Sequence, residues 1–327
     1  MSSAFVFEDE TLLCQQTVSG WSPVLVDLPA VSTDHKSQPP YQLGRVQLQI
    51  SLAPSYWQSA DSTTADSIVM QHDAPATSAI TYYYAQNHQL ALPKITPLSS
   101  VDAGADDANK DAVLEANDSA TTAFIPYRQL LATLSVALAD QLSQAIQLLR
   151  WQADTQFCSR CSAPVKLATS GERAMVCSVC RLRQYPRVQP CVITAITRLN
   201  PVTNEMQVLL AHHHRYGQKT PSLQYGLIAG FVEVGESLEH AVVREVAEEV
   251  GIRVTDIRYV SSQPWPFPSN LMLGFRASYV SGDIVIQEDE LSHAEFFDIS
   301  NLPKIPFKGS IAYDLIAQIA QEQGVCL

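Results

Sequence analysis

One stretch of this 327-residue chain, GFVEVGESLEHAVVREVAEEVGI at residues 230–252, constrains its structure most strongly. On a helix, Glu245, Glu248 and Glu249 stand at positions i, i+3 and i+4, so their carboxylates project from one side. Crowded carboxylates repel one another unless a hard cation neutralises them, and Mg²⁺ or Mn²⁺ suits oxygen ligands. The stretch therefore predicts a helix at residues 238–250 that carries a divalent metal site.

The residues around these glutamates support the same interpretation. Arg244 can pair with the carboxylates and orient them, while Val242, Val246 and Val250 supply a face that packs on a sheet. Gly251 suits a sharp turn at the end of the helix. Divalent ions held in this way bind pyrophosphate oxygens and help to ionise water, which predicts phosphoanhydride hydrolysis. The competing interpretation, a solvated helix that happens to be rich in glutamate, does not account for the full spaced pattern.

Four of the seven cysteines form a second motif. Cys158 and Cys161 make one C-x2-C pair, and Cys177 and Cys180 make another. Two such pairs can place four thiolates at the corners of a tetrahedron, the geometry of a closed structural zinc site, so we expect one Zn²⁺ per chain. The other cysteines, Cys14, Cys191 and Cys326, have no such spacing and are expected to be core or terminal residues.

The chain is expected to contain four parts. A mostly β N-terminal domain of uncertain role (1–127) precedes a connecting helix (128–156), a zinc ribbon (157–190) and an α+β domain (191–327) of mixed strands sandwiched by two helices. Residues 283–286, DIVI, are expected to form a strand, and the final helix starts near Ser310, a favourable N-cap. Residues 59–67 and 99–122 are rich in Ser, Ala, Asp and Thr, which predicts solvated loops.

Charge and hydropathy exclude some classes of function. A net charge of -12 argues against a protein that grips nucleic acid through bulk electrostatics, although an RNA end can still be a substrate. No apolar run approaches the roughly 20 residues needed to span a bilayer, so a cytoplasmic enzyme without a membrane partner is expected.

The segment SSQPWPFPSN, residues 261–270, follows a regular strand and is expected to be neither strand nor helix because of its three prolines. It would hold Trp265 and Phe267 on a rigid loop, and the prolines on both sides of Trp265 would lower the ordering cost of binding. The competing interpretation is that both aromatics plug the core or a dimer interface.

With these motifs in view, the chain resembles the Nudix hydrolases. The glutamate-rich stretch matches the Nudix signature, and the zinc ribbon together with SQPWPFP looks like the NADH pyrophosphatase branch, whose bacterial members also remove NAD caps from RNA. The resemblance covers roughly residues 128–327 and implies a Nudix fold. It implies a homodimer that uses Mg²⁺ or Mn²⁺ to hydrolyse NAD(H) to NMN(H) and AMP, with NAD-capped RNA as a candidate substrate.

The resemblance also implies roles for individual residues. The implied zinc ligands are Cys158, Cys161, Cys177 and Cys180. The implied ligands of the catalytic Mg²⁺ or Mn²⁺ are Glu245, Glu249, Glu290 and the carbonyl of Ala229, with Arg244 and Glu248 beside them in the catalytic set. The implied substrate contacts are Glu172, Tyr185, Phe231, Gln263, Pro264, Trp265, Pro266, Phe267, Pro268, Ser269, Asn270 and Ala312. Phe231 and Trp265 are expected to bracket the nicotinamide ring, the tryptophan coming from the second copy of a homodimer.

One residue departs from the family pattern, and one run of histidines has two interpretations. Asn270 stands where the family pattern has serine, which puts phosphate or ribose contacts in question. Three successive histidines, His212 to His214, face alternate sides of a strand end and are expected to lie in a solvated loop near the substrate entrance rather than in a metal site. Two alternative functions stay open: a Nudix hydrolase for ADP-ribose, dinucleoside polyphosphates or oxidised nucleotides, and a zinc-ribbon nucleic-acid-binding or regulatory protein.

Overall fold

The computed structural model describes residues 3–8, 10–27, 31–32, 41–44, 84–90, 121–168, 172–214 and 223–327. The chain divides into two compact units, Met1–Pro186 and Arg187–Leu327. Of the loops expected at residues 59–67 and 99–122, residues 59–67 and 99–120 lie outside the described residues, whereas Thr122 begins β8. Within the described ranges, no helix is long and apolar enough to cross a bilayer.

The first unit begins with a sheet, as expected for a mostly β domain. Its strands are β1 (Ser3–Glu8), β2 (Thr11–Thr17), β3 (Gly20–Pro23), β4 (Leu25–Asp27), β5 (Val31–Ser32), β6 (Tyr41–Gly44), β7 (Tyr84–Leu90) and β8 (Thr122–Pro126). They pair in the order β3-β2-β1-β6-β7-β5, with β4 on β1 and β8 on β2. Phe7, Leu12 and Leu13 are fully buried and form part of its core.

Two helices replace the single helix expected over 128–156. Helix α1 (Tyr127–Leu130) is one turn long, and helix α2 (Val136–Asp154) begins only after Ser135, whose side chain accepts a hydrogen bond from the N–H of Leu138. The hydroxyl of Tyr127 donates to the carbonyl of Ala139 at 2.6 Å and so ties the two helices together. The prediction of one helix was wrong because a local capping residue outweighed the apolar spacing that continues across the break.

A three-stranded sheet follows α2 and belongs to the same unit. Its strands are β9 (Val165–Leu167), β10 (Met175–Cys177) and β11 (Arg183–Gln184), in the order β11-β10-β9. Cys158 and Cys161 precede β9, Cys177 ends β10, and Cys180 lies in the turn between β10 and β11.

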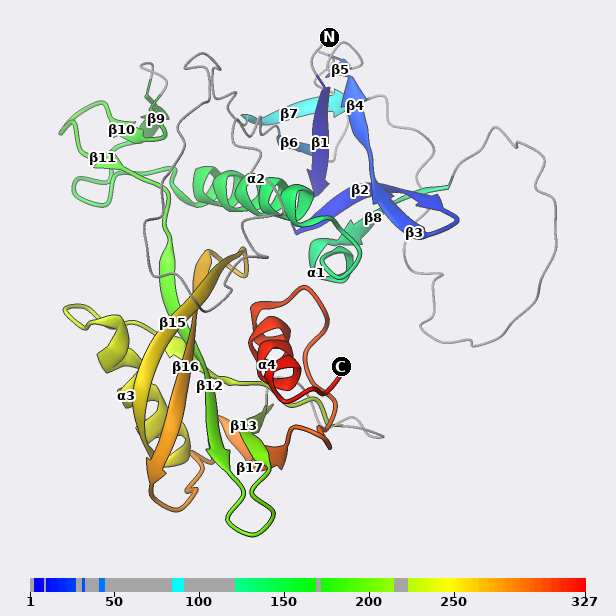
Figure 1. Ribbon diagram of the computed structural model, residues 1–327. Coiled ribbons are helices and arrows are strands. Elements are labelled where there is room, and N and C mark those ends of the chain that lie inside the picture. The colour runs from blue at the N-terminus through cyan, green and yellow to red at the C-terminus, as the bar shows by residue number, and fades with distance from the viewer. Residues whose placement is uncertain are drawn as a thin grey trace, which may run out of the picture. The chain divides into compact units, whose positions relative to one another are not determined.

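The second unit is a mixed six-stranded sheet between two helices (Figure 1). Its strands are β12 (Gln189–Leu199), β13 (Met206–His213), β14 (Ile228–Phe231), β15 (Arg253–Trp265), β16 (Asn270–Ser281) and β17 (Leu291–Asp298), and its helices are α3 (Leu238–Val250) and α4 (Ile311–Glu322). The strand order is β15-β16-β12-β13-β17, with β14 also paired to β12. Only β12 and β16 run parallel among these pairs.

Alternate residues of the central strand β12 face opposite helices. Val192 and Ile196 pack in the core that contains Val246 of α3, whereas Ile193 packs in the core that contains Leu315 of α4. Both helices therefore cover the sheet as predicted for an α+β domain, with one apolar core on each face.

Two local expectations in this unit were wrong. Residues 283–286 form no strand, because the chain turns at Gly282, with φ of 107°, and the N–H of Val285 bonds to the carbonyl of Val250. Residues 261–265 are part of β15, and Asn270 begins β16, so only the tip of the expected loop is irregular. Because β15 is the edge of the sheet, Pro264 can occupy a strand without breaking a ladder on its outer side.

Candidate active site

Helix α3 is positioned by the sequence signals at its two ends. The side chain of Ser237 accepts a hydrogen bond from the N–H of His240 at 3.2 Å, and Gly251 ends the helix with φ of 71°. Val242, Val246 and Val250 are fully buried against the sheet, as expected. The register of the helix is therefore fixed.

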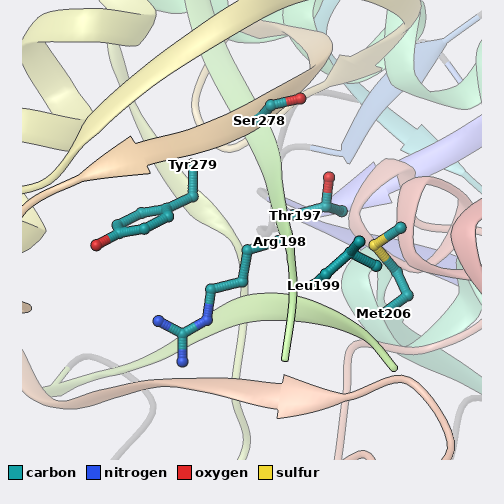
Figure 2. Close-up of a pocket in the computed structure, with 6 residues that line it drawn as sticks. All are labelled: Thr197, Arg198, Leu199, Met206, Ser278 and Tyr279. Carbon is teal, nitrogen blue, oxygen red and sulfur yellow. The ribbon is translucent and has the colours of Figure 1, made fainter. Parts of the chain in front are cut away.

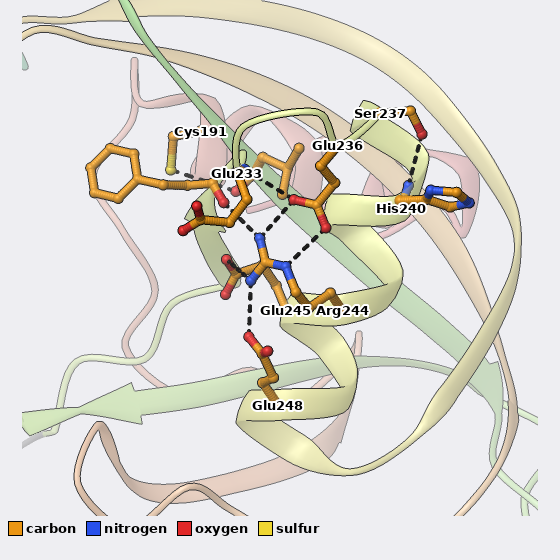
Figure 3. Close-up of polar contacts among 10 residues, drawn as sticks. Cys191, Glu233, Glu236, Ser237, His240, Arg244, Glu245 and Glu248 are labelled. Carbon is orange, nitrogen blue, oxygen red and sulfur yellow. Dashed lines mark hydrogen bonds and ion pairs between the residues drawn. The ribbon is translucent and has the colours of Figure 1, made fainter.

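Arg244 is the centre of a hydrogen-bond network on this helix (Figure 3). Its Nε and Nη2 atoms each donate to one carboxylate oxygen of Glu236 at 2.9 Å. Its Nη1 atom donates to Glu245 at 2.8 Å and to Glu248 at 2.9 Å, and Nη2 also donates to the carbonyl of Phe231 at 2.8 Å. The expected orienting contacts of Arg244 with Glu245 and Glu248 are thus present.

These contacts set the charge states of the carboxylates. Hydrogen bonds from Arg244 lower the pKa of Glu236 to about 2, and the N–H of Glu233 adds to this effect. The Glu236 carboxylate in turn raises the pKa of Arg244, so both stay charged. Burial raises the pKa of Glu245, an effect that Arg244 opposes and that the charges of Glu248 and Glu290 increase. A cation beside Glu245 would offset this penalty on its ionised form.

Glu249 and Glu290 lie in a second group, which includes a histidine. One donor atom from each of His213, Glu249 and Glu290 lies within 4.8 Å of the others. His213 and Glu249 are only 2% and 1% exposed, and the Nε2 atom of His213 lies 3.9 Å from an Oε atom of Glu249. Carboxylate oxygens and an imidazole nitrogen are donors that divalent metals accept, so this group fits a metal ion.

His213 is the residue of this group that the sequence prediction missed. The expectation of a loop at His212 to His214 was wrong for His212 and His213. These are the last two residues of β13, and both are buried. They do face opposite sides: His212 Nδ1 lies 2.7 Å from the carbonyl of Gln224, whereas His213 faces Glu249. The unbroken apolar run VLLA directly before them is the signal that could have indicated a strand buried on both faces.

The aromatic segment closes the hairpin between β15 and β16. The rings of Trp265 and Phe267 meet edge to face with centroids 5.3 Å apart, and Trp265 lies nearly parallel to Phe307 at 6.4 Å. Gln263 donates to the carbonyl of Gly309 and accepts from the N–H of Ile311, both at 2.8 Å. The side chain of Gln263 therefore ties the hairpin to the start of α4, and Phe307 is an aromatic neighbour that sequence reasoning did not single out.

Further residues that are expected to contact the substrate lie in the same hairpin. Pro264 lies in β15 opposite Leu271, and the tip of the hairpin comprises Pro266, Phe267, Pro268 and Ser269. The hydroxyl of Ser269 donates to the side chain of Gln189 at 3.0 Å. The amide of Asn270 donates to the carbonyl of Phe267 at 3.4 Å, so this residue braces the turn.

The remaining expected residues of this unit lie on two other elements. Phe231 ends β14 and is 46% exposed, with Ala229 two residues before it in the same strand. Ala312 is buried in the first turn of α4. Their contacts with a substrate stay predictions.

The zinc ribbon brings its four cysteines together. The sulfur atoms of Cys158 and Cys180 lie 3.4 Å apart, those of Cys161 and Cys177 lie 3.5 Å apart, and all four lie within 4.8 Å of one another. Four donors about 2.3 Å from one zinc ion would lie about 3.8 Å apart. The N–H of Cys180 donates to the sulfur of Cys177 and lowers the pKa of that thiol to about 6, which favours the thiolate that zinc requires.

Glu172 and Tyr185 belong to the same unit as the zinc ribbon. The hydroxyl of Tyr185 donates to Glu172 at 2.8 Å, and Arg183 forms an ion pair with the same carboxylate. The two expected substrate residues thus contact each other. The other cysteines agree with expectation, since Cys14 and Cys191 are buried and Cys326 is exposed near the C-terminus.

A hollow of about 420 Å³ lies at a different part of the second unit (Figure 2). It is lined by Thr197, Arg198, Leu199, Met206, Ser278 and Tyr279. The guanidinium of Arg198 lies 3.9 Å from the centre of the Phe296 ring, and its Nε donates to Gln207. None of the expected site residues lines this hollow, so we do not assign the active site to it.

Comparison with known families supports the assignment of both motifs. A model of the NUDIX domain matches residues 194–318, and a model of the NADH pyrophosphatase zinc ribbon domain matches residues 153–185. A crystal structure of a NUDIX hydrolase from Nitrosomonas europaea covers 52% of this chain and 94% of its own, with 24% identity and a TM-score of 0.41.

Curated relatives match over slightly more than half of this chain. The chain is 47% identical over 175 residues to the NAD-capped RNA hydrolase NudC of Klebsiella pneumoniae (strain 342), covering 53% of this chain and 63% of that protein. It is 45% identical over 185 residues to the protein of the same name from Shigella dysenteriae serotype 1 (strain Sd197), covering 56% and 67%. The alignments thus span about two thirds of the length of these relatives. This chain belongs to the NUDIX family, as a member that carries the NADH pyrophosphatase zinc ribbon domain.

Proposed function

We propose that the protein hydrolyses the pyrophosphate bond of NAD(H), giving NMN(H) and AMP, and that NAD-capped RNA 5′ ends are a second substrate. The observation that carries the proposal is the convergence of Glu249 and Glu290 within reach of one ion, beside the carboxylates that Arg244 orients. The NAD-capped RNA hydrolases among the relatives support the choice of substrate.

In the proposed reaction, the oxygen of a water molecule attacks one phosphorus and the phosphoanhydride P–O bond breaks. The proton of water passes to a carboxylate, for which Glu249 and Glu290 are the two candidates. Mg²⁺ or Mn²⁺ held by Glu245, Glu249, Glu290 and the carbonyl of Ala229 would neutralise charge on the anhydride oxygens. Arg244 keeps Glu245 and Glu248 in position for this work.

The nicotinamide ring would stack on Phe231 and Trp265, and we propose that a homodimer supplies these rings from different copies. In the sheet, β14 and β15 are separated by β12 and β16. Three strand spacings correspond to about 14 Å of backbone separation. That separation favours a site completed by the Trp265 of a second copy. We place the enzyme in the cytoplasm, in line with a site for NAD(H).

The direct test is to incubate the zinc-loaded protein with NADH and either Mg²⁺ or Mn²⁺, and to quantify AMP and NMNH by chromatography. Glu249→Gln and Glu290→Gln should each lower the rate by at least about 100-fold, the low end of a general-base contribution. Glu288→Gln is the matched control, because Glu288 is exposed, lies two residues from Glu290 and is not part of the group of His213, Glu249 and Glu290.

The outcomes separate the candidate functions. Absence of AMP and NMNH above the Glu249→Gln background would overturn the proposal. Faster turnover of ADP-ribose or a dinucleoside polyphosphate than of NADH and NAD-capped RNA would favour the alternative hydrolase. Tight RNA binding without turnover of any of these substrates would favour a binding or regulatory protein.

A further inference from the structure

We propose that the imidazole of His213 is a direct ligand of the catalytic metal site, sharing one divalent ion with Glu249 and Glu290. The inference rests on the proposed function only for the role of those two glutamates. It adds a nitrogen donor to a set that the family resemblance describes with oxygen ligands alone, and so changes which metals the site should prefer.

The geometry of the three donors supports one shared ion. The Nε2 atom of His213 lies 3.9 Å from an Oε atom of Glu249, and all three donors lie within 4.8 Å of one another. Two donors each about 2.1 Å from one ion are separated by about 3.0 Å at a right angle and by about 4.2 Å on opposite sides. The observed spacing is therefore close to that of a coordination sphere and is too long for a hydrogen bond between these two atoms.

The backbone holds the group in place without the ion. The N–H of His214 donates to the carbonyl of Glu290 at 3.0 Å, which joins the end of β13 to the turn before β17. The N–H of Gln287 donates to the carbonyl of Glu249 at 2.9 Å, which joins the same turn to the last turn of α3. The three donor residues thus lie on β13, on α3 and in the turn before β17, which are joined by backbone hydrogen bonds near the site. The ligands are therefore held in position before a metal ion binds.

The burial of His213 and Glu249 favours a bound cation over a water-exposed ion pair between them. The side chains of His213 and Glu249 are 3% and 2% exposed, whereas Glu290 is exposed and opens the group toward solvent. A divalent ion that enters past Glu290 would lower the energetic cost of burying the negative charge of Glu249.

An imidazole nitrogen shifts metal preference in a predictable direction. Mg²⁺ prefers oxygen ligands, whereas first-row transition ions accept imidazole readily. A site with two carboxylates and His213 should therefore favour ions such as Mn²⁺ over Mg²⁺ more strongly than the same site without His213.

Mn²⁺ is the probe for the test, because it is paramagnetic and reports on the nuclei bound to it. We would add less than one equivalent of Mn²⁺ to the full, zinc-loaded chain and record electron spin echo envelope modulation. The wild type should show modulation from a directly bound ¹⁴N nucleus, and His213→Gln should lose it. In titrations, His213→Gln should bind Mn²⁺ at least about tenfold more weakly, with a smaller change for Mg²⁺.

His212→Gln is the matched control, since His212 is a buried neighbour whose ring contacts the carbonyl of Gln224 on the other side of the strand. It should keep the ¹⁴N signal. If His213→Gln fails to fold, judged by circular dichroism and zinc content, His213→Asp replaces it and should bind Mn²⁺ without ¹⁴N modulation.

A wild-type spectrum without bound ¹⁴N, or equal Mn²⁺ affinity in wild type and His213→Gln, would overturn the ligand role. NADH hydrolysis, measured on the same samples, separates this failure from that of the proposed function. Hydrolysis without a nitrogen signal overturns the ligand role alone, whereas a nitrogen signal without hydrolysis overturns the proposed function alone.

Discussion

Gly230 and Glu245 are packed so closely that any side chain at position 230 would displace the carboxylate of Glu245. A Cβ atom added to Gly230 would lie 1.9 Å from Cδ of Glu245 and 2.1 Å from each of its carboxylate oxygens. Gly230 lies in β14 opposite Val192, and Glu245 reaches over it from α3. The carboxylate of Glu245 thus occupies the space that a side chain at position 230 would fill.

Gly230→Ala should therefore displace Glu245 and impair catalysis more than stability. The new methyl group has to push the carboxylate away from Arg244, and we expect kcat for NADH to fall by at least about tenfold, the effect of mispositioning a catalytic group. Ala247→Gly is the control: this exposed position on the same helix should cost about 1 kcal/mol of stability and leave kcat within twofold. Equal kcat in both variants would show that Glu245 needs no fixed position.

The ion pair of Glu236 with Arg244 should make stability depend on pH. The folded pKa of Glu236, about 2, lies below that of a carboxyl in an unfolded chain, so its stabilisation is fully present above about pH 4.5 and is lost as pH falls toward 2. The Tm difference between wild type and Glu236→Gln should shrink over that interval. Glu239→Gln, on the exposed first turn of α3, is the control and should show a smaller change. A Tm difference for Glu236→Gln that is constant with pH would contradict the assignment.

Features encoded by neighbouring residues could be predicted from the sequence. The bounds of α3 and the N-cap of α4 at Ser310 agree with expectation, because capping residues and apolar spacing act within a few positions of the chain. The spacing of the four cysteines likewise predicts that their sulfur atoms meet at one site, as they do.

Features that depend on strand register could not be predicted from the sequence. His213 joins Glu249 and Glu290 because β13 pairs with β17 and places its last residue beside the turn at 287–290, and nothing in the local sequence specifies that pairing. The strand expected at 283–286 does not form for a similar reason: the N–H of Val285 donates to the carbonyl of Val250 at the end of α3. Tertiary contacts decided both cases against local propensity.

Removing zinc should unfold the ribbon, because the four cysteine–zinc bonds contribute directly to its folding free energy. We expect one zinc per chain by elemental analysis in the wild type and less than 0.2, about a fivefold loss, in Cys177→Ser. Cys326→Ser, which changes an exposed cysteine outside the cluster, should keep one zinc per chain and serves as the control. A full zinc content in Cys177→Ser would rule out the four-cysteine site.

Trp265→Ala should distinguish nicotinamide substrates from other diphosphates. Loss of one stacking surface worth about 1 to 3 kcal/mol corresponds to a roughly 5- to 150-fold rise in KM for NADH. ADP-ribose lacks the nicotinamide ring, so its KM should change much less if Trp265 contacts that ring. Tyr259→Ala is the control, because Tyr259 is an exposed aromatic on the same edge strand that packs on Phe275 and lies away from the hairpin tip. Equal effects of Trp265→Ala on both substrates would mean that Trp265 supports the hairpin through Phe267 and Phe307 and does not recognise the nicotinamide half.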